Sequence, residues 1–324
     1  MRIGINFKKW GTVFCCLFLM AAAIVFSESQ REEKQKEIVM IMKIIDSNND
    51  FWSEFIQGAN MAAREYGVNV TVMGPDAETK YEEQGAMIEE TIQKKPDAVI
   101  LIPSNYTETQ QYARKIEEAG IPLVVVDSVM EEKMGSCVVA TDNIEAGRKM
   151  GQFIIENFDD ISCIGVVGHV KGVSTATERE QGLREGLGQL ESKVADVVFC
   201  DSDYRKAYLV TKEMLTRYPD MNVIAGLNEY SSVGAARAVI DLGLAGQIRM
   251  IGFDSSLKEV EYLEDGTFQA IVVQKPLNMG YLCVEKTAQL LEHEKIPEVV
   301  DSGSVLITKE TMYTEENQKL LFPF

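Results

Sequence analysis

Residues 38–53 read IVMIMKIIDSNNDFWS, an apolar run followed by a cluster of polar and aromatic side chains. The run from Ile38 to Ile44 predicts a β-strand, and it is continuous rather than alternating. A continuous apolar strand is covered on both faces, which is typical of a parallel sheet between two layers of helices. Three further runs of this kind follow it: Val70–Met73, Ala98–Ile102 and Leu123–Val126.

The same rhythm restarts after Asp142, so the chain repeats an architecture without repeating a sequence. Segments of helical length, such as Glu178–Leu190 and Tyr204–Tyr218, separate the second set of runs. A length of 324 residues also favours two domains, at roughly 100–200 residues each. We therefore predict an α/β protein with two doubly wound parallel-sheet lobes. The second lobe should hold strands at Cys163–Val167, Val197–Cys200, Val223–Ala225, Met250–Phe253 and Ala270–Val273.

The net charge of the chain limits the classes of partner that it is expected to bind. Fifty acidic residues against 32 basic ones give a net charge of -18 at neutral pH. Such a surface repels phosphate backbones, which need lysine and arginine for neutralisation, so we expect no nucleic-acid partner. A transcription regulator built on the same lobes is disfavoured for this reason, and an apolar segment stands where a helix-turn-helix would be needed.

The N-terminus resembles an export signal. Three basic residues within the first nine positions precede the apolar run Trp10–Phe26, and the polar segment Ser27–Glu37 follows. The positive-inside rule places the rest of the chain outside the cytoplasm. The run is near the lower limit of roughly 17–25 residues for a spanning helix, and no clear cleavage site follows Ala21–Ala23. We expect residues 1–37 to be an uncleaved anchor and linker; a cleaved signal, giving a secreted or periplasmic protein, is the alternative.

Neither the cysteines nor the histidines form a catalytic or metal-binding pattern. Cys15 and Cys16 lie in the apolar run, and the other cysteines are scattered singly without C-x-x-C spacing. His169 and His293 are far apart, and no G-x-G-x-x-G, Walker A or H-E-x-x-H sequence occurs. We predict no enzyme, no metal and no cofactor. A disulfide stays open for four cysteines that we expect to be buried: Cys137, Cys163, Cys200 and Cys283.

Polar and aromatic residues follow the predicted strands. Ligands of open α/β sheets bind outside the carboxyl ends of the strands, so these residues are candidates for contact. Asp and Asn at such positions also cap helices, which is the alternative for each one alone. Together they supply what a neutral polyol needs, namely carboxylate acceptors, an arginine fork, amides and aromatic faces. The set is Asn49, Phe51, Trp52, Asp127, Arg179, Asn228, Asp254 and Gln274.

The same residues predict the sign of the net charge in the cleft. Asp127 and Asp254 are two carboxylates against the single guanidinium of Arg179, so the cleft should be net negative. Phosphorylated and carboxylate ligands are disfavoured in such a site, and neutral or cationic ligands remain.

From Ile38 to Lys309 the chain resembles the type I periplasmic binding protein family, in particular its ribose-binding branch. The resemblance implies two lobes that close around a sugar and are joined by a three-strand hinge near Asp142, Gln274 and Asp301. It divides the chain into an N-terminal lobe, 38–141 plus 275–301, and a C-terminal lobe, 142–274 plus 302–324. The matching stretches are Ser47–Ser53, Ile121–Asp127, Ala140–Asn143 with Gly147, Ser174–Arg179 with Gly182, Asn228–Glu229, Ile251–Asp254 and Gln274.

The resemblance also implies roles for residues and partners. The eight candidates named above occupy the sugar-contacting positions of the family. Ser128 is a ninth expected ligand contact. It stands where the ribose binders have an arginine, and this difference points to another pentose, a hexose or a modified sugar. The protein is expected to be a monomer that delivers ligand to the permease of an ABC importer or presents it to a sensor such as a histidine kinase.

Overall fold

The computed structural model describes residues 35–322, and from Lys36 onward these residues form one compact unit. The expected anchor run, Trp10–Phe26, lies outside the described residues, as do Cys15 and Cys16. Among residues 35–322, no helix is both long enough and apolar enough to cross a membrane.

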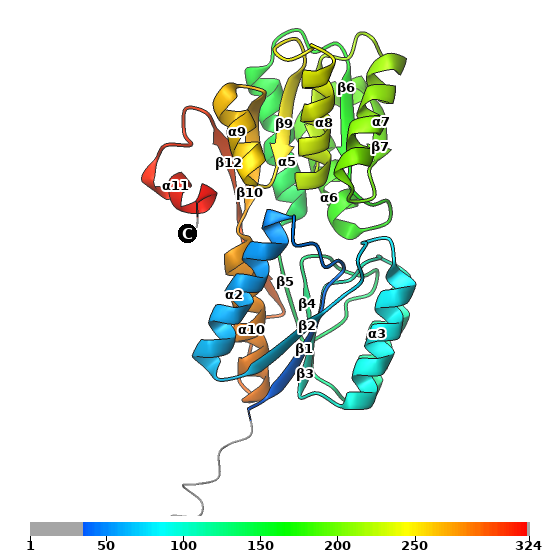
Figure 1. The fold of residues 1–324 in the computed structure, drawn as a ribbon, viewed down its shortest axis with the longest axis vertical. Coiled ribbons are helices and arrows are strands. Elements are labelled where there is room, and N and C mark those ends of the chain that lie inside the picture. The colour runs from blue at the N-terminus through cyan, green and yellow to red at the C-terminus, as the bar shows by residue number, and fades with distance from the viewer. Residues whose placement is uncertain (1–34, 323–324) are drawn as a thin grey trace, which may run out of the picture. The chain divides into compact units, whose positions relative to one another are not determined.

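The first sheet has six strands in the order β11-β5-β4-β3-β1-β2, and every neighbouring pair is parallel (Figure 1). This confirms the sheet type predicted from the continuous apolar runs. Two strands, β5 and β11, were not predicted. The strands are β1 (Glu37–Ile41), β2 (Asn69–Met73), β3 (Ala98–Leu101), β4 (Leu123–Val126), β5 (Cys137–Ala140) and β11 (Val299–Asp301).

Two layers of helices cover the first sheet. They consist of α2 (Asp50–Tyr66), α3 (Tyr81–Lys94), α4 (Gln110–Glu118) and α10 (Pro276–Leu291). Met40, Ile100 and Val124 pack with α2 and α10, which lie side by side, whereas Ile41 and Leu101 pack with α3 and α4 (Figure 1). Both faces of the strands are therefore buried, which explains why their apolar runs do not alternate.

The second sheet has the order β12-β10-β9-β8-β6-β7. All its pairs are parallel except β10 with β12, which is antiparallel. The edge strand β12 was not predicted. It runs antiparallel to β10, and the chain enters it directly from β11 of the first sheet. The strands are β6 (Ile164–Gly168), β7 (Val194–Phe199), β8 (Val223–Gly226), β9 (Arg249–Phe253), β10 (Phe268–Gln274) and β12 (Ser304–Thr308).

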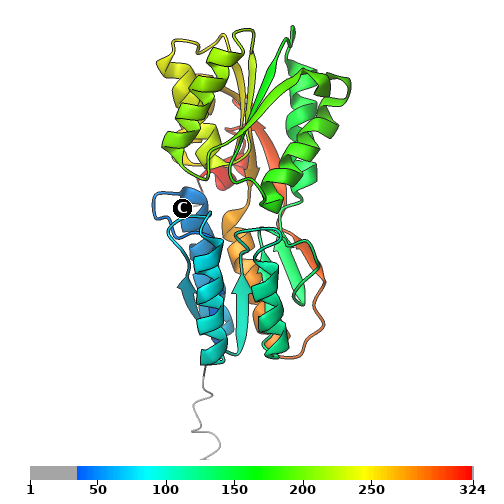
Figure 2. The ribbon, with the colours of Figure 1, turned by 90° about the vertical axis from the view of Figure 1, so that its right-hand side faces the viewer.

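Helices also cover both faces of the second sheet (Figure 2). They are α5 (Asn143–Asn157), α6 (Ser174–Leu187), α7 (Tyr204–Arg217), α8 (Glu229–Asp241) and α9 (Leu257–Asp265), with a 3-10 turn at Gly188–Lys193 and a last helix, α11 (Glu315–Leu321). Met150 and Leu183 of α5 and α6 share one core with Val166, and Met214 and Val239 of α7 and α8 lie in another. The chain thus has the two doubly wound lobes of the type I periplasmic binding protein fold.

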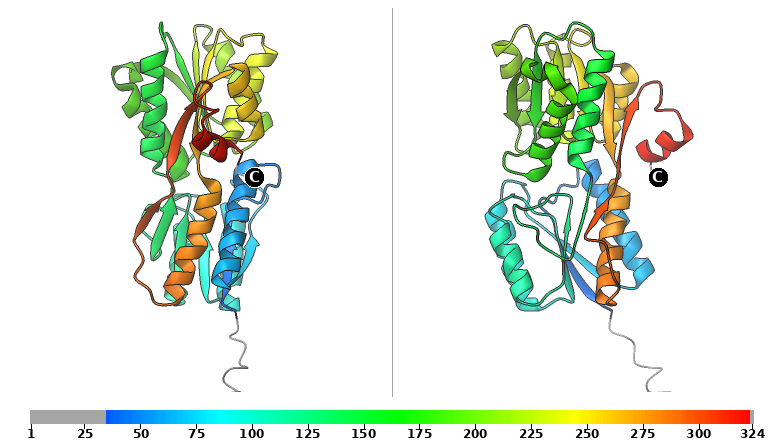
Figure 3. Two further views of the ribbon diagram at one scale, coloured as in Figure 1. Left: turned by 90° about the vertical axis from the view of Figure 1, so that its left-hand side faces the viewer. Right: turned by 180° about the vertical axis from the view of Figure 1, so that it is seen from behind.

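The chain passes between the two sheets three times: after β5, after β10, and between β11 and β12 (Figure 3). The three connections are hydrogen-bonded to one another. Thr141 Oγ1 donates to Gln274 Oε1 at 2.9 Å, and the Asp142 N–H donates to Asp301 Oδ1 at 3.1 Å. The residues expected at the hinge therefore lie next to each other, where a bend in the three strands would change the angle between the lobes.

The four cysteines within residues 35–322 are buried and free. Their burial confirms the prediction that they act as small apolar side chains. The disulfide left open by the sequence is not formed in the structure.

Candidate ligand-binding site

Lys43 lies two residues beyond β1 and is buried at the end of the first sheet. Its Nζ is 2.9 Å from Glu78 Oε1, 2.9 Å from Asp127 Oδ2 and 3.1 Å from Ser128 Oγ. Burial alone would lower the pKa of Lys43, but Asp127 and Glu78 outweigh that effect and raise it above its ordinary value. The two carboxylates neutralise the buried ammonium group as ion pairs, and the Ser128 hydroxyl accepts a hydrogen bond from it.

The start of α2 places two aromatic rings beside this charge. Asn49 caps the helix by accepting a hydrogen bond from the Trp52 N–H at 3.1 Å. The rings of Phe51 and Trp52 meet edge to face with centroids 4.8 Å apart, and Lys43 Nζ lies 5.5 Å from the Trp52 ring centroid. The capping interpretation therefore holds for Asn49, and the cap is also what orients the two rings.

Asp127 and Asp254 follow β4 and β9 in the left-handed backbone region, with φ of 61° and 88°. Such backbone costs roughly 1–3 kcal/mol for a residue other than glycine, and it is concentrated at ligand-binding sites. Both side chains are almost fully buried. The backbone at both strand ends is therefore strained. A role as a helix cap alone would not require this strain.

Arg179 reaches the same region from α6 because α6 packs very closely against α5. A Cβ atom on Gly147 would lie 2.2 Å from the carbonyl oxygen of Arg179, and one on Gly182 would lie 2.0 Å from that of Ile144. Only glycine permits such an approach. The two glycines thus determine how deeply the arginine side chain enters the site.

The guanidinium of Arg179 is buried and held on three sides. Its Nε donates to Asn143 Oδ1 and its Nη1 to the carbonyl of Leu227, both at 2.8 Å. The group also stacks over Phe253, 3.9 Å from the ring centroid. Burial lowers the pKa of Arg179, although Asp254 and Asp127 oppose that shift. A guanidinium keeps its charge under such conditions, so it remains a donor in the site.

Asp254 connects the remaining candidates. Its Oδ1 accepts from Gln274 Nε2 at 2.7 Å and its Oδ2 accepts from the Glu229 N–H at 2.9 Å. Burial raises the pKa of Asp254, whereas Arg179 lowers it. Asn228 caps α8: its side chain accepts a hydrogen bond from the Ser231 N–H, and its own N–H donates to the Ser231 hydroxyl. The carboxylate therefore links the hinge residue Gln274 with the start of α8.

These side chains enclose one cavity of about 30 Å³, which has room for about one or two water molecules. Eight of the nine residues predicted to bind ligand line it, and the ninth, Ser128, lies behind Asp127 and donates to it at 2.9 Å. That they contact a ligand stays a prediction. The lining consists of Lys43, Asn49, Phe51, Trp52, Glu78, Asp127, His169, Thr175, Arg179, Asn228, Tyr230, Asp254 and Gln274.

The two lobes touch over this cavity. The Phe51 N–H donates to Glu229 Oε2 at 3.4 Å, and the Tyr230 hydroxyl donates to Asp46 Oδ2 at 2.7 Å. Ser202 of the second lobe also bonds Glu78 of the first. A monosaccharide is far larger than the enclosed space, so the lobes must separate to admit one.

Sequence reasoning missed part of this lining. Lys43 could have been found from the sequence, because a lysine inside a buried apolar run needs an acidic partner nearby. Glu78 lies in a loop with no pattern around it, and Tyr230 lies within a helix. For His169 the sequence allowed a ligand contact but favoured an ordinary strand-end histidine; the side chain is buried in the lining, and its Nε2 lies 2.8 Å from Thr175 Oγ1.

The charge balance of the cavity also differs in detail from the expectation. Glu78 joins the two predicted carboxylates, and Lys43 joins Arg179, so three acidic groups face two cations. Burial, reinforced by the two cations, lowers the pKa of His169 well below its usual range, which leaves the ring neutral. The described residues contain no group of His, Cys, Asp and Glu that would suit a metal ion.

Comparison with known proteins agrees with this geometry. A family model described as a periplasmic binding protein domain matches residues 38–295. The chain belongs to the periplasmic binding protein family. It lies in the sugar-binding branch of the type I proteins, as the sequence motifs indicated, and membership implies a location outside the cytoplasm.

Three similar proteins illustrate the relationship of this periplasmic binding protein to others. The ribose import binding protein of Bacillus subtilis is 24% identical over 298 residues, covering 91% of this chain and 96% of its own. A sugar transporter structure from Clostridium phytofermentans is 43% identical, covers 85% of this chain and 100% of its own, and has a TM-score of 0.81. An ABC transporter solute-binding protein from Agrobacterium vitis, with D-fucose bound, is 30% identical, covers 88% and 100%, and has a TM-score of 0.83.

Glu229, beside the cavity, should make the stability of this periplasmic binding protein depend on pH. Burial, with Asp254 and Asp50, raises the pKa of Glu229 from 4.5 to about 8, against the opposing hydrogen bond from Tyr204. The folded protein then binds this proton more tightly than the unfolded chain does. The free energy of unfolding should therefore decrease as pH rises from about 4.5 to about 8.

Urea unfolding at pH 5, 6.5 and 8 measures this effect. Glu229→Gln should flatten the decrease, and the exposed Glu213→Gln should leave it as in the wild type. An equal slope in wild type and Glu229→Gln would show that the carboxyl group is not held protonated by its surroundings.

Proposed function

We propose that the protein is an extracytoplasmic solute-binding protein for a small neutral sugar and the substrate-binding component of an ABC importer. The observation that carries this proposal is the cavity in which Asp127 of the first lobe and Arg179 and Asp254 of the second meet two aromatic rings. Carboxylates, a guanidinium, amides and rings form the inventory that recognises hydroxyl groups and C–H faces. Both lobes contribute, so ligand and closure support each other.

The charges of the cavity favour a neutral ligand over either ion. Lys43 and Arg179 would repel a cation, and Glu78, Asp127 and Asp254 would repel a phosphate or a carboxylate. Lys43 and Glu78 carry opposite charges, so the lining keeps the excess of one carboxylate expected from the sequence, and Lys43 adds a positive group that a cationic ligand would have to approach. The relative from Agrobacterium vitis with bound D-fucose supports a monosaccharide of this kind.

Binding proceeds by bending at the three connections between the lobes. A ligand first contacts one lobe, and the second lobe then closes over it, so the closed population rises with occupancy. The hydrogen bonds of Thr141 with Gln274 and of Gln274 with Asp254 join the hinge to the cavity. No covalent step is involved.

We expect neutral sugars to bind to the protein and sugar phosphates not to bind. Thermal-shift measurements with D-ribose, D-fucose and D-allose test the first statement, because a ligand at about 100 times its Kd adds roughly 2.7 kcal/mol of stability. Calorimetry with ribose 5-phosphate tests the second. Tighter binding of the phosphate than of the free sugar would contradict the assignment of the cavity.

A membrane-anchored sensor that presents bound sugar to a histidine kinase is the second candidate. The apolar run Trp10–Phe26 favours it, since a protein held at the membrane does not need to diffuse to its partner. Permease and ATPase genes beside this one would support import, and kinase and regulator genes would support sensing.

Both candidates share the expectation that the signal is retained. Protein from the native host should keep residues 1–26 and stay in the membrane fraction through carbonate washing, because the apolar run is long enough to span. N-terminal sequencing and immunoblotting of washed membranes measure this. A mature N-terminus between Ala23 and Gln30 would show cleavage instead.

A further inference from the structure

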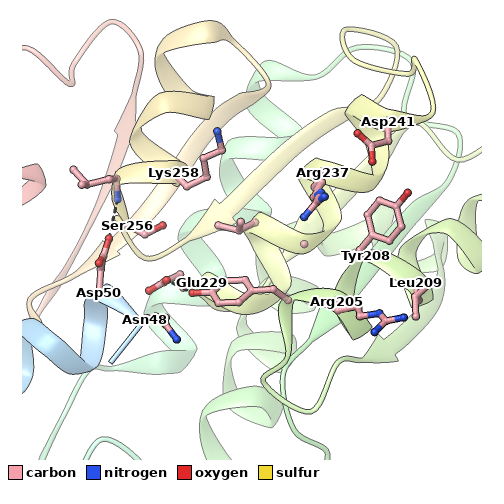
Figure 4. A pocket seen from close by; sticks show the side chains of 14 residues that line it. Asn48, Asp50, Arg205, Tyr208, Leu209, Glu229, Arg237, Asp241, Ser256 and Lys258 are labelled. Atoms are coloured by element: carbon pink, nitrogen blue, oxygen red, sulfur yellow. Dashed lines mark hydrogen bonds between the residues drawn. The ribbon is translucent and has the colours of Figure 1, made fainter. Parts of the chain in front are cut away.

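Five carboxyl groups gather where the two lobes meet, beside the ligand cavity. Asp50 and Glu54 lie on α2 of the first lobe, whereas Glu229, Asp254 and Glu259 belong to the second lobe. Glu54 and Asp254 line one small pocket between the lobes. Asp50 and Glu229 line a groove that also includes residues of both lobes (Figure 4). Closure therefore brings carboxyl groups of opposite lobes together.

Two hydrogen bonds show that these contacts depend on closure. Asp50 Oδ2 accepts from the Leu257 N–H at 3.1 Å, and Glu229 Oε2 accepts from the Phe51 N–H at 3.4 Å. Each bond joins the two lobes. Separation of the lobes breaks both bonds and moves Glu54 and Glu229 away from the carboxyl groups of the opposite lobe.

No cation neutralises this cluster directly. None of the five carboxyl groups forms an ion pair within residues 35–322. The buried guanidinium of Arg179 acts on Asp254, but its hydrogen bonds go to an amide and a carbonyl oxygen. Three basic side chains share the groove with Glu229, and all are exposed, so solvent screens them: Arg205, Arg237 and Lys258.

Glu259 shows how this region accommodates a carboxyl group. It is fully buried, its Oε2 accepts from the N–H and the hydroxyl of Ser256, and its Oε1 has no hydrogen-bond partner within residues 35–322. Burial, with Asp254 and Glu229, raises the pKa of Glu259 well above its usual range. An ionised oxygen without a partner is costly in such surroundings, whereas the protonated group is tolerated.

Glu54 and Glu229 are affected by the opposite lobe as well as by their own. Burial, with Asp50 and Asp254, raises the pKa of Glu54 from 4.5 to about 7. Burial also raises the pKa of Glu229 to about 8, with Asp254 and Asp50 adding to it and the hydrogen bond from Tyr204 opposing it. Asp254 faces Glu54, and Asp50 faces Glu229, only across the junction of the lobes. The closed form therefore binds these protons more tightly than the open form does.

We propose that closure of the lobes takes up protons at Glu54 and Glu229, so that the protein binds its sugar more tightly at acidic than at alkaline pH. The proposal rests on the proposed function, because sugar binding is the event that closes the lobes. The protons pass from the solvent to the two carboxylates, since a neutral sugar has no group that titrates in this range. Closure is thus favoured at low pH, and this advantage is lost as pH rises from about 4.5 to about 8.

Calorimetry on the full-length protein, in a detergent that carries no sugar, tests this coupling. The ligand is D-ribose, D-fucose or D-allose, whichever binds most tightly. Titrations at pH 6.5 in cacodylate, MES and imidazole, which differ in ionisation enthalpy, give the number of protons taken up per sugar bound. We expect about one proton or more, and a Kd at least about tenfold larger at pH 8 than at pH 5.5.

Glu54→Gln identifies the proton acceptor, because glutamine has the size of a protonated glutamate and stays neutral at every pH. The variant should take up at least about half a proton less and bind the sugar about tenfold more tightly than the wild type at pH 8, with affinity at pH 5.5 within about twofold. A side chain with a purely structural role would not raise affinity at one pH alone. Glu229→Gln should change both quantities in the same direction and tests the proposal even where Glu54→Gln fails to fold.

The control is Glu213→Gln, which removes an exposed carboxylate on α7 and should behave as the wild type. A wild type that binds sugar with no proton uptake, or with a Kd independent of pH, would overturn the proposal while sugar binding stands. Full proton uptake in both Glu54→Gln and Glu229→Gln would overturn it too, since another group such as Asp254 would then take the protons. Failure of all three sugars to bind the wild type would instead reject the proposed function, and this inference with it.

Discussion

Replacement of Asp254 by asparagine should weaken sugar binding by at least about tenfold while the protein stays folded. Hydrogen bonds to a charged group contribute roughly 1.5–3 kcal/mol each, and the asparagine amide retains only one acceptor oxygen. In the structure both carboxylate oxygens are already engaged, one by Gln274 and one by the Glu229 N–H. The variant therefore loses charge toward the ligand and one internal acceptor.

Asparagine is a better test than alanine at this position. Asp254 has φ of 88°, a region that asparagine tolerates and that strains an alanine. Asp254→Ala should consequently lower both affinity and the free energy of unfolding, whereas Asp254→Asn should lower chiefly affinity. Calorimetry with the tightest-binding sugar and urea unfolding separate the two effects.

The control is Asp220→Asn, which removes one acidic charge at an exposed position far from the lining of the cavity. Its affinity should match that of the wild type. Wild-type affinity in Asp254→Asn, with the protein folded by circular dichroism, would mean that the aspartate only holds α8 and Gln274 in place.

Replacement of Lys43 by methionine should destabilise the protein by roughly 3–5 kcal/mol. Glu78 and Asp127 would then lie buried with no cation between them, and an unpaired buried charge is costly because the low dielectric screens it poorly. Methionine retains most of the stem of the side chain, so the loss reports the charge rather than a cavity. Urea unfolding at pH 7 measures the change.

Two comparisons make this prediction specific. Lys36→Met breaks an exposed pair with Asp97, 3.9 Å long, and should cost no more than about 1 kcal/mol. Adding Glu78→Gln to Lys43→Met should recover part of the lost stability, because it removes one of the two stranded carboxylates. A Lys43→Met variant as stable as Lys36→Met would show that the three charges are not packed as described.

The order of most strands along the chain and the parallel pairing of the inner strands could be derived from the sequence. Ile38–Ile44 and the runs that follow it are apolar without alternation, and that pattern depends only on which faces are covered. The same order places Asp127 and Asp254 at strand ends, which is why they could be named as candidates before any coordinates. The edge strands β11 and β12 were missed, because at the edge of a sheet their residues are mostly half-buried or exposed and do not form the continuous buried run of the inner strands.

The residues around those candidates depended on the tertiary structure. Glu78 lies in a loop whose local sequence has no periodicity, yet it meets Lys43 at 2.9 Å because the fold brings two separate segments together. The hydrogen bond from the Leu257 N–H to Asp50 Oδ2 joins residues 207 positions apart, one in each lobe. Sequence patterns report local preference and burial, which act along one element. Charge pairs and contacts between the lobes form between separate elements, so only the arrangement of those elements in space determines them.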